Sequence, residues 1–286
     1  MRLRRRRTAP KAARLNRREI AEMYAADAMT NCLIAVGAAE GATHDSGAVA
    51  FAIARRWAAH GRNVLLVDAD ASGPKLARRL GEANKSVLSP AQRGLPSLMA
   101  ARQPVTAELL RQHCWNLDVP GTGSLWLLLG PTSTTGAQLA AKWLAQNADD
   151  LSAASSDRCM IVDMSPAAIR GEEAPGAFMQ AAGAVVLIAP AGAGQSAEAM
   201  RVRAVSPDNG TERHVVCLVS DGSAVDGSDD TCDALDMRVV GRLEGVRERL
   251  LLRKGLRRRR RKPARLVDEM AARVALLASN GDRDEK

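Results

Sequence analysis

The stretch that most constrains the fold of this chain runs from Cys32 to Asp70. It opens with an apolar run of strand length at 32–36 and continues into a loop rich in glycine and alanine. Apolar periodicity then predicts a helix from about Ser46 to His60, and a second apolar run, Val64–Val67, is followed by Asp68-Ala69-Asp70. This order is a βαβ unit, whose first turn brings free backbone N–H groups and a helix N-terminus to one point, where a phosphate can bind.

The loop of this unit has the layout of a P-loop but not its charges. A P-loop reads G-x-x-x-x-G-K-[ST], in which glycines let the backbone curl round the phosphates, the lysine neutralises them and the hydroxyl binds magnesium. Here Ser46 stands at the hydroxyl, Asp45 at the lysine and His44 at the last glycine. A carboxylate close to a triphosphate is repelled by roughly 4 kcal/mol per charge pair at an effective dielectric constant near 20. Either the loop does not bind ATP in the usual way, or another residue supplies the positive charge.

Strand and helix patterns alternate along the rest of the chain. Further apolar strands are predicted at 125–129, 159–162, 184–188, 215–219 and 239–243. This alternation predicts an α/β fold, with a mostly parallel sheet covered by helices on both faces. Ligands of such sheets bind at the carboxyl ends of the strands, where this chain carries Gly37, Asp68, Asp70 and Asp163.

The positive charge of the chain is concentrated in two short runs. Residues 1–18 and 253–265 each hold nine Lys and Arg and no acidic residue, which leaves 23 basic and 32 acidic residues elsewhere, a net charge of −9. Any attraction to DNA, RNA or anionic lipid is therefore expected in those runs. The ordinary alternative is that they are solvated tails. Aromatic residues make up only 2% of the chain, which argues against a stacking platform for single-stranded nucleic acid.

Cysteine usage and hydropathy favour a protein of the reducing cytoplasm. The five cysteines have no C-x-x-C spacing, and we interpret them as small buried hydrophobic residues rather than as disulfides or a metal site. They are Cys32, Cys114, Cys159, Cys217 and Cys232. The basic start is not followed by the apolar region of a signal peptide, and no apolar run approaches the ~18 residues that span a membrane. We therefore expect a cytoplasmic protein, peripheral to the nucleoid or the membrane if the basic runs bind there.

The order of elements, together with VDADASGPKLARRLG at 67–81, resembles the ParA/MinD group of deviant-Walker ATPases, which are P-loop NTPases of the SIMIBI type. Within that group the chain is similar to CpaE/TadZ-like members, which often carry an eroded loop with no lysine. The family's loop, K-G-x-x-G-x-[ST]-[ST], lies over EGATHDSG at 40–47 position for position. The departures are Glu40 for the signature lysine, His44 for glycine, Asp45 for the second lysine and Gly47 for a hydroxyl.

The resemblance implies the residues of a site and its cofactors, ATP and magnesium. Asp70 matches the family's water-orienting carboxylate, and the metal ligands would be Ser46, Asp68 and the Walker B-like Asp163. The implied nucleotide-binding loop consists of Gly37, Glu40, Gly41, Ala42, Thr43, His44, Asp45, Ser46 and Gly47.

Each of these residues also has an ordinary structural interpretation. The aspartates suit helix caps or turns, and Ser46 suits the N-cap of its own helix. Arg55 and Arg56 follow the loop and are interpreted as part of a solvated helix face rather than as a replacement for the lysine.

We expect four regions: a basic disordered tail at 1–18, a P-loop ATPase-like domain at 19–252, a basic segment at 253–265, and a C-terminal helix and tail at 266–286. The predicted helix at 264–279 is interpreted as packed on the sheet, with a helix on an anionic membrane surface as the alternative. The candidate contacts to nucleic acid or lipid are Arg257, Arg258, Arg259, Arg260, Arg261 and Lys262.

The sequence leaves three functional hypotheses open. The first is a positioning or regulatory protein with an eroded nucleotide site and weak or no hydrolysis, which dimerises and docks onto pilus, secretion or partition machinery. The second is an active ParA/MinD-type ATPase for DNA partitioning or spatial positioning. The third is a nucleic-acid-binding protein that uses its Arg-rich segments, with binding that falls steeply as salt rises. The resemblance implies a homodimer, or pairing with an intact paralogue that supplies the missing lysine.

Overall fold

The computed structural model describes residues 32–39, 42, 44–72, 75–84, 88–169, 178, 181–190, 214–220, 238–243, 251–252 and 261–280. They form one eight-stranded sheet in the order β3-β4-β2-β5-β1-β6-β7-β8, in which only the pair β3–β4 is antiparallel. The strands are β1 (Leu33–Ala38), β2 (Asn63–Ala69), β3 (Trp115–Leu117), β4 (Ser124–Leu128), β5 (Cys159–Met164), β6 (Ala184–Pro190), β7 (His214–Ser220) and β8 (Arg238–Arg242). The predicted α/β fold with a mostly parallel sheet is confirmed.

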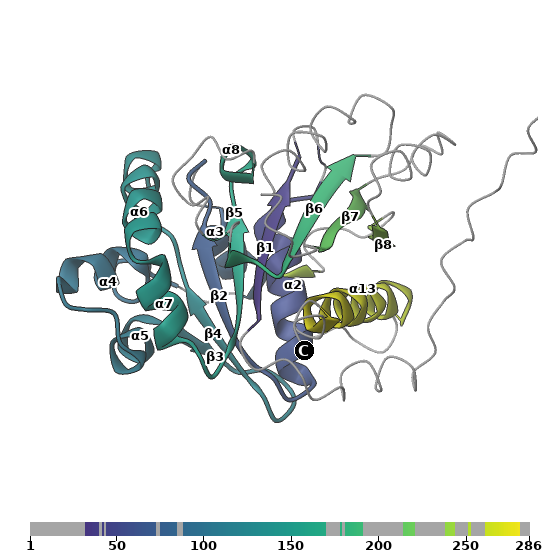
Figure 1. Cartoon of the computed structure of the whole chain (residues 1–286), viewed down its shortest axis with the longest axis horizontal. Coiled ribbons are helices and arrows are strands. Elements are labelled where there is room, and N and C mark those ends of the chain that lie inside the picture. The colour runs from purple at the N-terminus through teal and green to yellow at the C-terminus, as the bar shows by residue number, and fades with distance from the viewer. Residues whose placement is uncertain are drawn as a thin grey trace, which may run out of the picture.

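Helices cover both faces of this sheet (Figure 1). One face carries α2 (Ser46–Ala59), α3 (Leu76–Asn84) and α13 (Arg261–Asn280). The other carries α4 (Leu95–Ala101), α5 (Ala107–His113), α6 (Thr134–Gln146) and α7 (Ala148–Ala154), and a short helix, α8 (Pro166–Ile169), follows β5.

The central strands are buried on both faces, as their continuous apolar runs require. Successive side chains of a strand point to opposite faces, so Val64 and Leu66 of β2 pack under α2, whereas Leu65 and Val67 pack under α4 to α7. The core is built mainly from Leu, Val, Ile and Ala, in keeping with the few aromatic residues of the chain.

Helix α13 packs on the sheet beside α2, which confirms the packed interpretation of the C-terminal helix. Its residues Val267, Met270 and Val274 are buried in the same core cluster as α2. The indole Nε1 of the fully buried Trp57 donates a hydrogen bond of 2.9 Å to the carbonyl oxygen of Ala271. The helix therefore closes one face of the domain.

The interpretation of Arg55 and Arg56 as a solvated helix face is wrong, because α13 covers this part of α2. Arg55 is only 6% exposed, its guanidinium lies 5.9 Å from the centre of the Phe51 ring, and burial lowers its pKa to about 10. Arg56 Nε lies 2.8 Å from Asp268 Oδ1 on α13. Both guanidinium groups therefore lie in the contact between α2 and α13, and neither replaces the missing lysine of the loop.

Several sequence predictions fall outside the described residues: the tail at 1–18 and the contacts Arg257 to Arg260. Arg261 and Lys262 form the first turn of α13. Within the part of the chain that the structure describes, no helix combines the length and the apolar character needed to cross a membrane.

Candidate functional site

The candidate site lies where β1, β2 and β5 end. In the parallel register, Asp68 of β2 lies directly opposite Asp163 of β5, and Asp163 in turn lies opposite Val36 of β1. The loop after β1 starts from this edge, and its Ala39 N–H donates to the carbonyl oxygen of Ile188 on the next strand, β6, over 2.8 Å. The sheet thus brings the two predicted carboxylates together beside the loop.

The loop ends in Asp45, which caps helix α2. The Asp45 backbone is extended, and its Oδ1 accepts a hydrogen bond of 3.2 Å from the Ala48 N–H. An aspartate is well suited to this position because its carboxylate satisfies an otherwise unpaired helix N–H and complements the helix dipole. The alternative that Ser46 is the N-cap is therefore wrong, and Ser46 is free for another role: its hydroxyl hydrogen-bonds to the Asp163 carboxyl.

Asp163 is the most deeply buried acid of the site. Its side chain is enclosed against the start of α2, since a Cβ added to Gly47 would lie 2.5 Å from Asp163 Oδ2. Asp163 Oδ1 is buried and has no hydrogen-bond partner. Burial, followed by the negative charges of Asp68, Asp45 and Asp70, raises the pKa of Asp163 well above its ordinary value, against the lowering effect of the Ser46 hydroxyl. The site therefore favours the protonated form of Asp163 more than water does.

Asp68 is buried beside it and is partly stabilised by the backbone. Burial and the charges of Asp70 and Asp45 raise the pKa of Asp68 to about 7, while hydrogen bonds from the backbone N–H groups of Gly130 and Asp70 act in the opposite direction. A Cβ added to Gly130 would lie 2.9 Å from the Asp68 carbonyl oxygen, so the segment that follows β4 packs closely against Asp68. At neutral pH Asp68 is about half ionised.

Asp70, the predicted catalytic residue, is held in a turn. Its Oδ1 accepts hydrogen bonds from the Ser72 N–H over 2.8 Å and from the Ser72 hydroxyl over 2.6 Å. This is the local side-chain-to-backbone bonding with which aspartates stabilise turns. Asp70 Oδ2 lies 3.7 Å from the Lys75 ammonium. The observed contacts of Asp70 thus agree with the alternative interpretation of this residue as one that stabilises a turn.

Two basic residues of the site were missed by the sequence reasoning. Lys75 pairs with Asp70, and Arg79 Nη1 of α3 lies 3.3 Å from Asp45 Oδ2. The signal available in the sequence was their spacing: a separation of four places two residues on one side of a helix, and the Arg79 N–H does bond to the Lys75 carbonyl oxygen over 3.0 Å. Lys75, directly before α3, and Arg79 within α3 therefore both lie beside aspartates that precede this helix.

Part of the predicted loop lies outside the described residues, namely Glu40, Gly41 and Thr43. Ala42 is held by a hydrogen bond of 3.1 Å from its N–H to the Ala39 carbonyl oxygen, and His44 is buried. Gly37 lies at the end of β1 directly beneath the side chain of Ile169 from α8, which occupies the space that a Cβ would need.

The charges of these residues do not fit a triphosphate. Asp45 occupies the place at which a P-loop needs a cation, and Lys75 and Arg79 each form an ion pair with an aspartate of the site. The oxygens of Ser46 and Asp163 are donors of the kind that magnesium prefers. Nevertheless, among the residues that the structure describes, no three His, Cys, Asp or Glu side chains are arranged to hold a metal ion.

No family model matches the sequence, and a search of curated proteins finds no match either. Solved structures do match. A ParA family ATPase from Chlorobium tepidum TLS superposes with a TM-score of 0.67 at 14% identity, over 84% of this chain and 98% of that one. The cell division ATPase MinD of Pyrococcus furiosus gives a TM-score of 0.60 at 13% identity, over 84% and 97%.

The septum site-determining protein MinD of Pyrococcus horikoshii OT3, solved with Mg-ADP, gives a TM-score of 0.60 at 14% identity, over 88% of this chain and 99% of that one. These matches extend over nearly the whole length of each neighbour. The chain therefore has the α/β P-loop fold of the ParA/MinD ATPases.

Proposed function

We propose that this chain is a ParA/MinD-like positioning or regulatory protein with an eroded nucleotide site. It acts by dimerising and docking onto a partner, such as pilus, secretion or partition machinery. In this proposal the P-loop fold serves as a scaffold, and any ATP hydrolysis is weak or lacking.

The observation that carries the proposal is the placement of Asp45. This residue caps α2 at the position where a P-loop presents its lysine, and it pairs with Arg79. Burial, together with the negative charges of Asp45 and Asp70, raises the pKa values of both Asp68 and Asp163. A bound triphosphate would add negative charge to a place that already disfavours it.

The structural neighbours support the positioning half of the proposal. They include a MinC:MinD cell division protein complex from Aquifex aeolicus and a putative plasmid partition protein from Borrelia burgdorferi B31 bound to AMPPNP. Transferred to this chain, they suggest a protein surface that recruits a partner. The neighbours also support the alternative function, an active ATPase, because one of them, McdA(D38A) from Cyanothece, was solved in complex with ATP.

Calorimetry with ATP and magnesium tests the eroded site. Wild-type protein is expected to give no binding heat, whereas Asp45→Lys is expected to bind at least about 100-fold more tightly than wild type. The reason is that one repulsive charge pair costs roughly 4 kcal/mol at an effective dielectric constant near 20, and every 1.4 kcal/mol is tenfold in affinity.

The matched control is Asp45→Asn, which removes the charge and keeps a good N-cap. Its affinity should lie between those of wild type and Asp45→Lys. Micromolar binding by wild type would overturn the proposal in favour of an active ATPase. Sedimentation without nucleotide tests the second half: a dimer is expected, and a monomer at tens of micromolar would count against docking as a dimer.

A further inference from the structure

A pair of thiols lies at the amino-terminal ends of β1 and β5, whereas the candidate site lies at the carboxyl ends of these strands. Cys32 immediately precedes β1, and Cys159 is the first residue of β5. These strands are paired in parallel with Leu33 opposite Met160, so the register places Cys32 opposite Cys159. The Met160 N–H donates to the Cys32 carbonyl oxygen over 2.7 Å, which extends the pairing to Cys32 itself.

This register brings the two sulfurs within reach of each other. Neighbouring strands lie roughly 4.8 Å apart, and the Cα atoms of a disulfide lie about 4.4–6.8 Å apart. Directly opposed residues of a parallel pair point to the same face: Cys159 belongs to the core cluster under α2 and α13, and Cys32 packs against that cluster. The two side chains are hydrogen-bonded to each other.

The residues around the two cysteines favour a state in which one of the two thiols is ionised. The Arg62 guanidinium, which stacks over the Trp57 ring at 5.4 Å, also hydrogen-bonds to Cys159. Chiefly because of the hydrogen bond from Cys32, and with help from Arg62, the pKa of Cys159 falls to about 7, whereas burial raises the pKa of Cys32. The thiolate is the reactive form of cysteine, and a neighbouring arginine is a recognised way to stabilise it.

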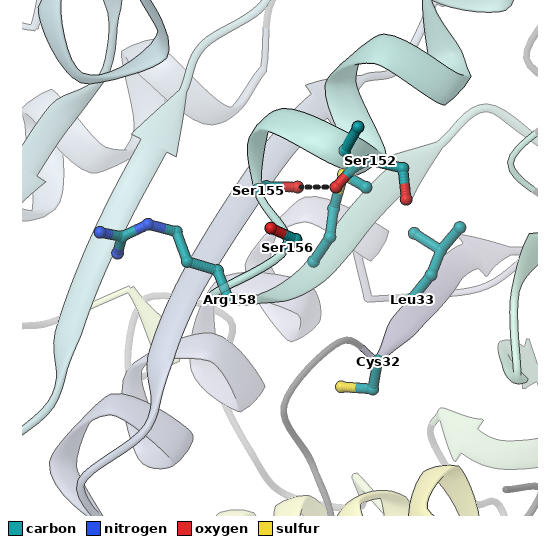
Figure 2. A pocket seen from close by; sticks show the side chains of 8 residues that line it. Cys32, Leu33, Ser152, Ser155, Ser156 and Arg158 are labelled. Atoms are coloured by element: carbon teal, nitrogen blue, oxygen red, sulfur yellow. Dashed lines mark hydrogen bonds between the residues drawn. The ribbon is translucent and has the colours of Figure 1, made fainter. Parts of the chain in front are cut away.

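The Cys32 end of the pair is open to small solutes. Cys159 is 1% exposed, but Cys32 is half-buried. Beside Cys32 lies a cavity of about 220 Å³, which is also lined by Leu33, by Ser152 of α7, and by Ser155 and Ser156 between α7 and β5. Figure 2 shows how these side chains lie around it. A single water occupies about 30 Å³ of liquid, so a molecule the size of a peroxide fits in it.

We propose that Cys32 and Cys159 form a modification site, at which a peroxide oxidises the two thiols to a cross-strand disulfide between β1 and β5. The proposal does not depend on nucleotide binding at the other edge of the sheet.

A proton first passes from the Cys32 thiol to the Cys159 thiolate along the hydrogen bond that joins them. The Cys32 thiolate then attacks one peroxide oxygen, the O–O bond breaks, and the hydroxide that leaves takes a proton to become water, which gives a sulfenic acid on Cys32. The Cys159 sulfur then attacks the Cys32 sulfur, the S–O bond breaks, and the second hydroxide leaves with a proton as water. In total two thiols lose two electrons and two protons, and one peroxide is reduced to two waters.

Peptide mapping of the full chain tests the proposal. Reduced protein is treated with hydrogen peroxide, denatured, blocked with N-ethylmaleimide and digested with trypsin. The expected product joins peptides 19–55 and 159–170, is lighter by two hydrogens than their sum, and disappears on reduction with dithiothreitol. Cys114 is buried and its pKa is raised to about 12, so peptide 112–142 should carry the maleimide throughout.

Two variants provide the controls. Cys114→Ser should leave the cross-link unchanged, and Cys32→Ser should abolish it and leave Cys159 to the maleimide. Phenylarsine oxide, which bridges neighbouring thiols, should protect both Cys32 and Cys159 of the untreated wild type from the maleimide. Linkage of either cysteine to peptide 214–238, or sulfinic acid on Cys32 without a cross-link, would overturn the proposal.

Discussion

Replacing Trp57 by alanine is expected to lower the free energy of unfolding by about 3–5 kcal/mol, the usual cost of removing a fully buried tryptophan. The Trp57 ring has no exposed surface and lies between the sheet and α13. Its Nε1 also donates a hydrogen bond to the Ala271 carbonyl oxygen, and the variant loses this bond. Urea denaturation followed by circular dichroism measures the loss.

Two further variants separate packing from hydrogen bonding. Trp57→Phe keeps most of the apolar contact and loses the donor, so we expect a loss of about 1–3 kcal/mol. Trp143→Ala removes a half-buried ring from α6 on the other face and should cost less than Trp57→Ala. A Trp57→Ala protein within 1 kcal/mol of wild type would show that α13 is not held on α2 in solution.

The stability of the wild-type protein is expected to fall as the pH rises from about 4 to about 7, owing to Asp68 and Asp163. The folded-state pKa of Asp68 is about 7, above its ordinary value of 3.8, and that of Asp163 is raised in the same direction. The folded protein therefore binds more protons than the unfolded chain in this window, and the unfolding free energy decreases with pH. Between pH 5 and pH 8 Asp68 alone accounts for about 3 kcal/mol, because the loss of 1.36 kcal/mol per pH unit stops near its folded-state pKa of about 7.

The measurement compares unfolding free energies of wild type and Asp68→Asn at both pH values. The asparagine cannot ionise, so the variant should lose less stability than wild type between pH 5 and pH 8. The burial that lowers the pKa values of His60 and His113 makes the unfolding free energy rise with pH, opposite to the effect of Asp68. The contribution of Asp68 is therefore measured as the difference between wild type and Asp68→Asn. The exposed Asp157→Asn is the matched control. Equal pH slopes for wild type and Asp68→Asn would contradict the buried-carboxylate description.

The parallel centre of the sheet could be predicted because each strand there is a run of apolar residues with a polar or small residue at its end. The runs before Asp68 and Asp163 reach the same edge, and the register indeed sets these residues side by side. Strand β3 was not predicted. It has only three residues, too few for a periodic pattern, and it pairs antiparallel at the edge of the sheet.

The contacts of the basic residues could not be predicted from the sequence. Arg55 and Arg56 look like residues of a solvated helix face, and only the docking of a helix more than 200 residues later buries them. Likewise, the pairing of Arg79 with Asp45 depends on where α3 lies relative to the loop. Helix α7 was missed because one residue, Asn147, separates it from α6 and its composition of Ala, Ser and Asp is ambiguous.

The hydrogen bond between Trp57 and Ala271 joins residues 214 positions apart in the chain. At the usual synthesis rate of roughly 5–20 residues per second, Trp57 is synthesised some 10–40 s before Ala271. During that interval the apolar surface of α2 lacks the helix that covers it. The slow step in the folding of this protein during synthesis is therefore expected to be the docking of helix α13, and a nascent chain that stalls before residue 261 should be retained by chaperones.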